Sequence, residues 1–204
     1  MNSILPASAL YTFAAINSTV NLIIDTDAGL AVDDIGALAV AHHYADQGKV
    51  NLLATMHNTA CVKGIAAVNV INTYYGRGDT PLGAYKGTFG INCDSQDTYL
   101  SNLINSYPNG GITSSASVRD AKDVYVDVLK AQPDKSVTIA SIGFPVNIRN
   151  VLRNHPDLFE QKVKAVYYMN GPYNFGCAEG YLGPEFDCYR AAQEVQERFP
   201  HSVD

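Results

Sequence analysis

The chain has 204 residues, a formal net charge of −6 and a sequence pI near 5.2. This length suits one good-sized domain with a single core, and it allows a second domain without requiring one. Hydrophobic residues make up 47% of the chain and charged residues 17%, a balance that excludes wholesale disorder. The acidic charge and the scattered Lys and Arg residues argue against a nucleic-acid partner, and no apolar run is long enough to span a membrane.

Residues 1–19 read as an N-terminal extension ahead of a domain at residues 20–204. Residues 4–15 are apolar and rich in small side chains, as in a signal or leader peptide, but no Lys or Arg precedes them. Asn17 begins an Asn-Ser-Thr glycosylation sequon, which matters only outside the cytosol. These features leave secreted and cytoplasmic locations equally open.

Strand and helix patterns alternate along the rest of the chain. In chain order the predicted elements are a strand at 20–25, a helix at 33–46, a strand at 50–56, a helix at 62–75, a strand at 81–84, helices at 99–106 and 118–131, a strand at 137–141, a helix at 146–153, a strand at 163–169 and a helix at 186–199. This alternation predicts an α/β fold with an open, mostly parallel sheet and helices on both faces. Ligands of such sheets bind beyond the carboxyl ends of the strands.

Four carboxylates lie at or just beyond the end of the first predicted strand: Asp25, Asp27, Asp33 and Asp34. Like charges crowded at a strand end repel one another, so a cation among them is the simplest explanation. Carboxylate oxygens suit a hard divalent cation, either Ca²⁺ or Mg²⁺. The segment does not match an EF-hand loop, because Gly36 stands where that loop has a glutamate. Helix capping explains one or two of the acids and leaves the others unexplained.

The pattern Asp-Thr-Asp-x-Gly-x-x-x-Asp-Asp at residues 25–34 resembles the signature of the inosine–uridine nucleoside hydrolase family. It is closest to the subgroup with two extra residues between the glycine and the paired acids. Later segments match the family in the same order, at Asn58, at residues 137–148 and at residues 167–174. The resemblance covers about residues 20–200 and implies an open α/β sheet with a bound Ca²⁺.

The resemblance also implies roles for individual residues. Asp27 and Asp34 would bind Ca²⁺ through carboxylate oxygens, and Val146 would add its backbone carbonyl, where the family more often has Thr. Asp27 would also be the catalytic base. A metal lowers the pKa of water and a nearby carboxylate collects the proton, so these parts suit a hydrolytic reaction near neutral pH.

By the same resemblance, Asp33, Asn58 and Asn174 hydrogen-bond the hydroxyls of ribose. The implied reaction is hydrolysis of the N-glycosidic bond of a ribonucleoside to ribose and free base. A catalytically inactive relative that binds ribosides or a protein partner through the acidic pocket is the main alternative. A Mg²⁺-dependent phosphatase or transferase is a weaker one, and the sequence leaves a homo-oligomer open.

The chain departs from the family pattern in two places. Met169, Asn170 and Gly171 stand where the family has Met-Gly-Gly, and Pro172 occupies the neighbourhood of a ribose-contacting Glu. Family members typically continue beyond the position of Asp204 into a segment with a His-Asp pair. We therefore expect a chain that is C-terminally incomplete or naturally shortened.

The cysteines and one histidine are further candidates for chemistry. Cys61, Cys93, Cys177 and Cys188 show neither CxxC spacing nor pairing with His, so a zinc site is a poor interpretation. We expect four free, partly buried thiols, with a Cys177–Cys188 bridge as the alternative in a secreted protein. His57 follows the second predicted strand and is a candidate for lining the pocket.

Overall fold

The computed structural model describes residues 19–29, 31–88, 90, 93, 99–169 and 197–198 of the chain. The strands are β1 (Val20–Thr26), β2 (Val50–His57), β3 (Leu82–Ala84), β4 (Arg119–Asp120), β5 (Val137–Ser141) and β6 (Val163–Tyr168). The helices are α1 (Asp33–Asp46), α2 (Gly64–Tyr74), α3 (Leu100–Ser106), α4 (Ala121–Lys130), α5 (Val146–Asn154) and α6 (Pro156–Lys162), and Ser115–Ser117 form a short 3-10 helix. In the described part of the chain, no helix combines the length and the apolar character that a membrane crossing needs.

The strands form one sheet in the order β4-β3-β2-β1-β5-β6, and every pair of neighbours is parallel. The predicted α/β fold with an open parallel sheet is therefore confirmed. The chain builds the sheet outward from β1 to β4 and then returns to add β5 on the other side of β1. The direction of winding reverses between β1 and β5, and ligands of open α/β sheets bind at such a switch point.

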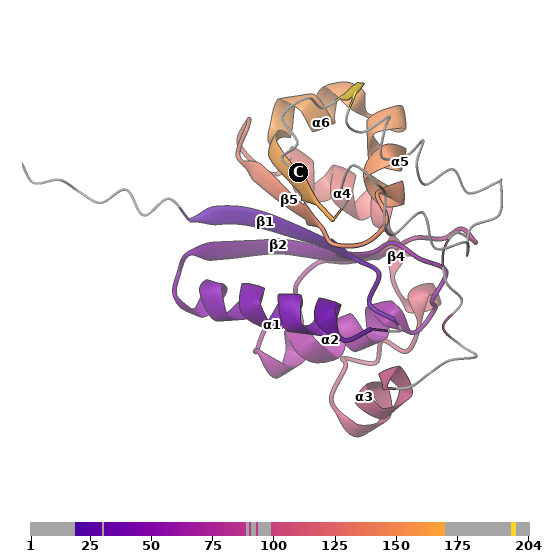
Figure 1. The fold of residues 1–204 in the computed structure, drawn as a ribbon. Coiled ribbons are helices and arrows are strands. Elements are labelled where there is room, and N and C mark those ends of the chain that lie inside the picture. Colours follow the sequence, from indigo (N-terminus) through magenta and orange to yellow (C-terminus); the bar gives the residue numbers. More distant parts are fainter. Residues whose placement is uncertain are drawn as a thin grey trace, which may run out of the picture.

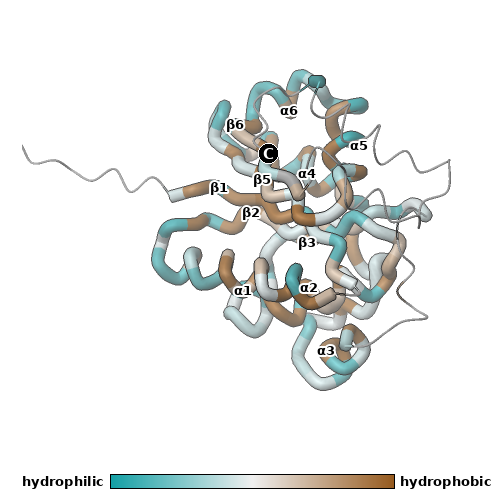
Figure 2. Tube along the Cα trace, in the orientation of Figure 1, coloured by the Kyte–Doolittle hydropathy of each residue, from teal (hydrophilic) through white to brown (hydrophobic). Residues whose placement is uncertain are grey.

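Helices cover both faces of the sheet (Figure 1). One core lies between the sheet and α1 and α2, and it is built on Ile24, Leu38 and Ile65. The other core lies under α4, α5 and α6, and Ile139 and Phe159 are among its fully buried members. Strands β1 and β2 contain hydrophobic stretches where they run between the two helical layers (Figure 2). Burial on both faces explains why the strands read as continuous apolar runs.

Strand β4 and helix α6 differ from the predicted elements. The start of the helix predicted at 118–131 is instead β4, because Arg119 and Asp120 pair with β3. Helix α6 was not predicted; it begins at Pro156, whose fixed φ suits the first turn of a helix. Of the helix predicted at 186–199, only residues 197–198 lie within the described residues.

Candidate functional site

Three chain segments meet at the carboxyl ends of the central strands. The acidic turn follows β1, Asn58 follows β2, and residues 142–145 follow β5. Two main-chain hydrogen bonds hold them together: the amide of Asn58 donates to the carbonyl of Thr26 at 3.0 Å, and the amide of Ile142 donates to the carbonyl of Asp25 at 2.8 Å. The segments therefore gather at the switch point between β1 and β5, where the topology favours a ligand site.

The acidic turn holds its carboxylates at different depths. Asp34, in the first turn of α1, is 6% exposed, Asp27 is half-buried and Asp33 is exposed. The hydroxyl of Thr26 donates to Oδ1 of Asp34 and accepts from the amide of Ala28 at 3.1 Å. This hydroxyl ties the start of α1 to the end of β1, so Asp34 is held close to Asp27.

The electrostatics of the turn are unfavourable to two free carboxylates. The pKa of Asp27 is raised to about 7, first by burial and next by the charge of Asp34. The pKa of Asp34 is raised to about 6, first by burial, while the hydrogen bond from Thr26 lowers it. Both groups would ionise more readily beside a cation, because an opposite charge stabilises the charged form.

These donors fit a hard divalent cation. Asp27 and Asp34 supply two adjacent carboxylates, which are the oxygen ligands that Ca²⁺ prefers. Within the described ranges, no three His, Cys, Asp or Glu side chains converge as a metal site. A cation here would therefore complete its coordination with main-chain oxygen or water. Val146, the buried first residue of α5, lies shortly after the turn that contacts Asp27.

That contact is made by Gly143, in the turn after β5. A Cβ atom built on Gly143 would lie 2.7 Å from the amide nitrogen of Asp27, 2.8 Å from its carboxyl carbon and 2.8 Å from Oδ1 of Asn58. No real side chain fits such distances, so only glycine lets the turn approach both residues. The structure thus brings Asp27 and Asn58 together, as expected of parallel strand ends.

Below this contact lies a network of buried hydrogen bonds centred on Asp25. Its carboxylate accepts from the side-chain amides of Asn58 at 3.1 Å and Asn147 at 3.0 Å, and from the hydroxyl of Tyr125 at 3.0 Å. Burial raises the pKa of Asp25 to about 7, and the three hydrogen bonds act in the opposite direction. Asn58 is itself fully buried, and its Oδ1 accepts from the amide of Phe144 at 3.2 Å.

His57 supports the acidic turn from beneath. Its ring is fully buried, and Nε2 lies 3.1 Å from the carbonyl oxygen of Ala28. Because a carbonyl can only accept, Nε2 carries the proton and donates it. Burial lowers the pKa of His57 to about 4, so the ring is neutral near pH 7. His57 does not line an open pocket, the role for which the sequence made it a candidate, because the strand end carries it into the interior.

A disulfide between Cys61 and Cys93, with Cα atoms 5.0 Å apart, replaces the expected free thiols. Both cysteines are 1% exposed and lie beside Gly29 of the acidic turn. The expectation was wrong because the two residues are 32 positions apart and only the tertiary fold brings them together. Cys177 and Cys188 lie outside the described residues.

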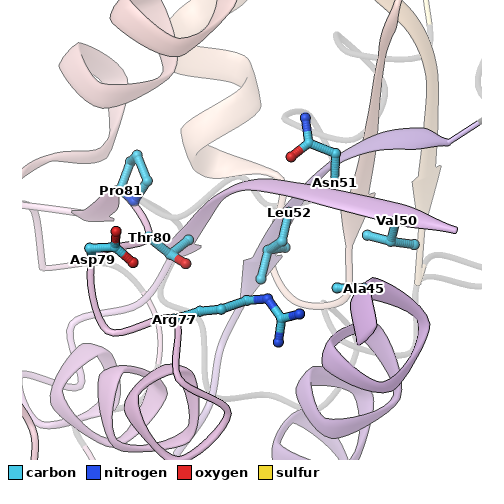
Figure 3. A pocket seen from close by; sticks show the side chains of 8 residues that line it. All are labelled: Ala45, Val50, Asn51, Leu52, Arg77, Asp79, Thr80 and Pro81. Atoms are coloured by element: carbon cyan, nitrogen blue, oxygen red, sulfur yellow. The ribbon is translucent and has the colours of Figure 1, made fainter. Parts of the chain in front are cut away.

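A separate cavity of about 400 Å³ lies at the opposite edge of the sheet (Figure 3). It is lined by Ala45, Val50, Asn51, Leu52, Arg77, Asp79, Thr80 and Pro81. Arg77 is already paired with Asp46 at 2.7 Å. Val50 begins β2, so this cavity belongs to the amino ends of the strands and is remote from the acidic turn.

The structure places only some of the predicted site residues together. The structure gathers Asp27, Asp34 and Asn58 at one place, leaves Asp33 exposed at the start of α1, and does not describe Asn174. Sequence reasoning counted Asp25 among the acids of the turn without giving it a role of its own, and it missed the donors Tyr125 and Asn147. No local pattern pointed to Tyr125.

Solved structures share this fold at low sequence identity. The inosine-uridine preferring nucleoside hydrolase from Bacillus anthracis gives a TM-score of 0.58 at 17% identity, over 75% of this chain and 51% of that one. The purine-preferring ribonucleoside hydrolase from Gardnerella vaginalis gives 0.54 at 20% identity, over 74% and 48%. The type III effector protein XopQ, complexed with adenosine diphosphate ribose, gives 0.64 at 14% identity, over 88% and 53%. The chain spans about half the length of these structures.

Sequence comparison then identifies the family. A search among curated proteins gives no match. The family profile described as inosine-uridine preferring nucleoside hydrolase matches residues 22–190, which is most of the chain and includes the whole acidic turn. The chain therefore belongs to the inosine-uridine preferring nucleoside hydrolase family.

Proposed function

We propose that this chain hydrolyses the N-glycosidic bond of a ribonucleoside, with Ca²⁺ held at the acidic turn. Family membership supports the coarse function. The single observation that carries the finer assignment is the close approach of Asp27 and Asn58 on either side of Gly143. It holds a poised carboxylate against a fixed, buried amide at the switch point of the sheet, where ligands of open α/β sheets bind.

In the proposed reaction, water attacks the anomeric carbon of the ribose. The oxygen of the water bonds to that carbon, the bond to the base nitrogen breaks, and the base leaves with the electron pair. Asp27 accepts the proton of the attacking water at its carboxylate, which the neighbouring cation would keep ionised. The sugar passes through an oxocarbenium-like state, as in the hydrolysis of other glycosides.

The remaining site residues hold the reactants in place. Asp27 and Asp34 would hold Ca²⁺ by their carboxylates, together with the carbonyl of Val146. Bound there, the ion would supply positive charge that makes water a stronger nucleophile near neutral pH. Asp33 would bind a ribose hydroxyl, with Asn174 from a segment outside the described residues. Asn58, which was expected to share this role, is fully buried and hydrogen-bonded at both ends of its amide, so it would hold the turn after β5 in place instead. Fixing the sugar in this way contributes to the rate through orientation.

A second candidate is a protein that binds a ribosyl ligand without cleaving it. The structural match to the ADP-ribose complex of XopQ has a TM-score of 0.64 and covers 88% of this chain, against 0.58 and 75% for the Bacillus anthracis hydrolase. The match to the effector protein therefore covers more of this chain than the match to the enzyme does. With this function, the acidic turn would hold a ribose or a metal ion, and no water would attack the sugar.

One experiment separates the two functions. The purified chain is mixed with inosine or uridine and Ca²⁺, and ribose release is measured with a reducing-sugar assay. Hydrolysis predicts release that Asp27→Asn lowers by about 10²–10⁴-fold, since the variant lacks the base. The matched control is Asp46→Asn, which changes an exposed carboxylate at the far end of α1 that pairs with Arg77.

The binding function predicts a different pattern. No ribose is released from either nucleoside, while calorimetry detects binding of ADP-ribose that Asp27→Asn weakens. Release that is equally fast in wild type and in Asp27→Asn would rule out the proposed base. Absence of both release and binding would reject both functions.

A further inference from the structure

Asp25 is a buried carboxylate to which the proposed reaction assigns no role. Its side chain is 0% exposed and accepts three hydrogen bonds from three different elements. Oδ1 accepts from Asn58, at the end of β2, and from Asn147, in the first turn of α5. Oδ2 accepts from the hydroxyl of Tyr125 in α4. One side chain of β1 is therefore linked to β2, α4 and α5 at the base of the candidate site.

Two of these donors connect Asp25 to the surroundings of Asp27. Asn58 donates to Asp25 with its amide nitrogen and accepts from the amide of Phe144 with its oxygen, so both ends of its side chain are fixed. The same oxygen lies 2.8 Å from the Cβ position of Gly143, as does the carboxyl carbon of Asp27. The turn that packs against Asp27 is thus anchored through Asn58 to Asp25.

The second connection passes through α5. Asn147 donates to Oδ1 of Asp25 at 3.0 Å and also to the carbonyl of His57 at 3.1 Å. Asn147 is 1% exposed and directly follows Val146. The start of α5 is therefore tied to β1 and β2 by a single amide that has no access to water.

We propose that Asp25 is a positioning residue, whose buried carboxylate fixes Asn58 and residues 143–147 relative to Asp27. Without it, two amide groups and one hydroxyl lose their acceptor in a closed interior, where an unpaired polar group is costly. The donors would turn toward other acceptors and carry residues 143–147 with them. The kinetic consequence rests on the proposed function, whereas the geometric consequence does not.

The geometric consequence is measured by amide hydrogen exchange of residues 142–147, with the kinetic constants recorded in parallel. Asp25→Ala is expected to speed exchange there about tenfold, as expected for loss of one hydrogen bond's protection. It should lower kcat for nucleoside hydrolysis about 100-fold with a smaller change in KM, because a misplaced site loses alignment. Asp25→Asn should restore most of both, since its oxygen still accepts from the two amides and Tyr125 can reverse to accept.

The matched control is Asn72→Ala, which truncates another fully buried polar side chain. Asn72 donates to Thr55 at 3.0 Å and is hydrogen-bonded to His42 at 2.9 Å, on the face covered by α1 and α2. We expect a lower melting temperature in this variant, with exchange at residues 142–147 and kcat both unchanged. A purely structural role for Asp25 predicts instead that the two alanine variants behave alike.

A second variant covers the case in which Asp25→Ala does not fold. Tyr125→Phe keeps the aromatic packing and removes only the donor to Oδ2, and about threefold faster exchange at residues 142–147 is expected. Unchanged exchange in every folded variant of Asp25 and Tyr125 overturns the inference, as does an equal increase in Asn72→Ala. If the wild type releases no ribose and the Asp25 variants still show faster exchange at residues 142–147, the inference is supported and the proposed hydrolase function is rejected.

Discussion

Gly143 illustrates how one residue limits what the site can tolerate. Gly143→Ala would place a methyl group 2.7 Å from the amide nitrogen of Asp27 and 2.8 Å from Oδ1 of Asn58. Both neighbours are held by backbone or by buried hydrogen bonds, so the turn must move instead. We expect a stability loss of roughly 1–3 kcal/mol. We also expect kcat/KM to fall about 100-fold, because the site loses its alignment.

The control for this substitution is Gly36→Ala in α1, where a Cβ atom would meet nothing within 4 Å. An alanine inside a helix is favoured over glycine by about 0.5–1 kcal/mol, so this variant should be slightly more stable and equally active. Denaturant unfolding and ribose release measure both variants. If Gly143→Ala keeps wild-type stability and rate, the turn does not press on Asp27 as described.

His57 gives the molecule a stability term that depends on pH. Its pKa is about 4 in the folded protein against an ordinary 6.5, because the neutral ring is buried. The unfolded chain therefore takes up a proton first as pH falls below 6.5, and the folded state is destabilised until pH 4. Between pH 7 and pH 5 the wild type should lose about 2 kcal/mol relative to His57→Gln. The measurement is denaturant unfolding at both pH values.

His43→Gln is the control, because His43 is an exposed histidine in α1. It should leave the difference between pH 7 and pH 5 as it is in the wild type. Identical pH dependence in wild type and His57→Gln would mean that His57 can be protonated in the folded protein and is not confined as the structure has it.

At the residue scale, sequence reasoning reached the side chains that local patterns display. Asp27, Asp34 and Asn58 follow strand ends, and a parallel sheet brings such positions together. Tyr125 could not be found in this way, because it is 100 positions from Asp25 and sits in an unremarkable amphipathic helix. The depth of each group was also hidden, since burial depends on packing from elements distant in the sequence. Asn58 was expected to face a sugar and is fully buried in the structure.

At the element scale, the predictions succeeded where local signals agree with tertiary packing. Helix α1 occupies the predicted residues, because acids begin it, apolar residues face the sheet, and Gly48 with φ of 69° follows its end. Strand β4 was missed because two residues carry no pattern of their own and form a strand only by pairing with β3. Asp120, its second residue, then caps α4 by accepting from the amide of Lys122.

The disulfide between Cys61 and Cys93 links the start of the α2 region to a distant segment beside the acidic turn. Closing a loop between residues 32 positions apart restricts the unfolded chain, and the loop-entropy relation gives a stabilisation of roughly 3–4 kcal/mol. We expect the Cys61→Ser, Cys93→Ser double variant to lose about that amount. Denaturant unfolding under non-reducing conditions measures it.

Reduction of the wild type provides the matched comparison. A reducing agent should lower wild-type stability toward that of the double variant and leave the double variant unchanged. A wild type that is insensitive to reduction, while free thiols are detected at both positions by labelling, would show that the bond contributes nothing to stability.

At the scale of the whole molecule, the alternation of strands and helices was enough to predict a parallel sheet covered on both faces. It was not enough to predict the strand order, because the placement of β5 beside β1 depends on pairing between residues more than a hundred positions apart. That placement is what creates the switch point and brings residues 142–145 to the acidic turn. The location of the candidate site therefore followed from the predicted fold, whereas the buried network around Asp25 could be found only in the structure.

The same architecture couples the stability of the molecule to pH, and the proposed Ca²⁺ site would couple it to the ion. The pKa values of Asp27 and Asp34 are raised to about 7 and about 6, from 3.8, chiefly by burial. The folded state thus holds more protons than the unfolded state between pH 4 and pH 7, and stability falls as pH rises through this window. A cation bound by the ionised carboxylates would offset this loss. At low pH the cation must displace protons from these carboxylates to bind, whereas at high pH they are already ionised.

We therefore expect Ca²⁺ to raise the melting temperature by several degrees at pH 8 and by much less at pH 5. Thermal unfolding with Ca²⁺ or with a chelator, at both pH values, measures the effect. Asp27→Asn should abolish the response at pH 8, because it removes one ligand charge, whereas Asp46→Asn, an exposed carboxylate at the far end of α1, should retain it. An equal Ca²⁺ response in Asp27→Asn and wild type would place the ion elsewhere. An equal response at pH 5 and pH 8 would show that binding displaces no proton, and would contradict the coupling between the acidic turn and the stability of the fold.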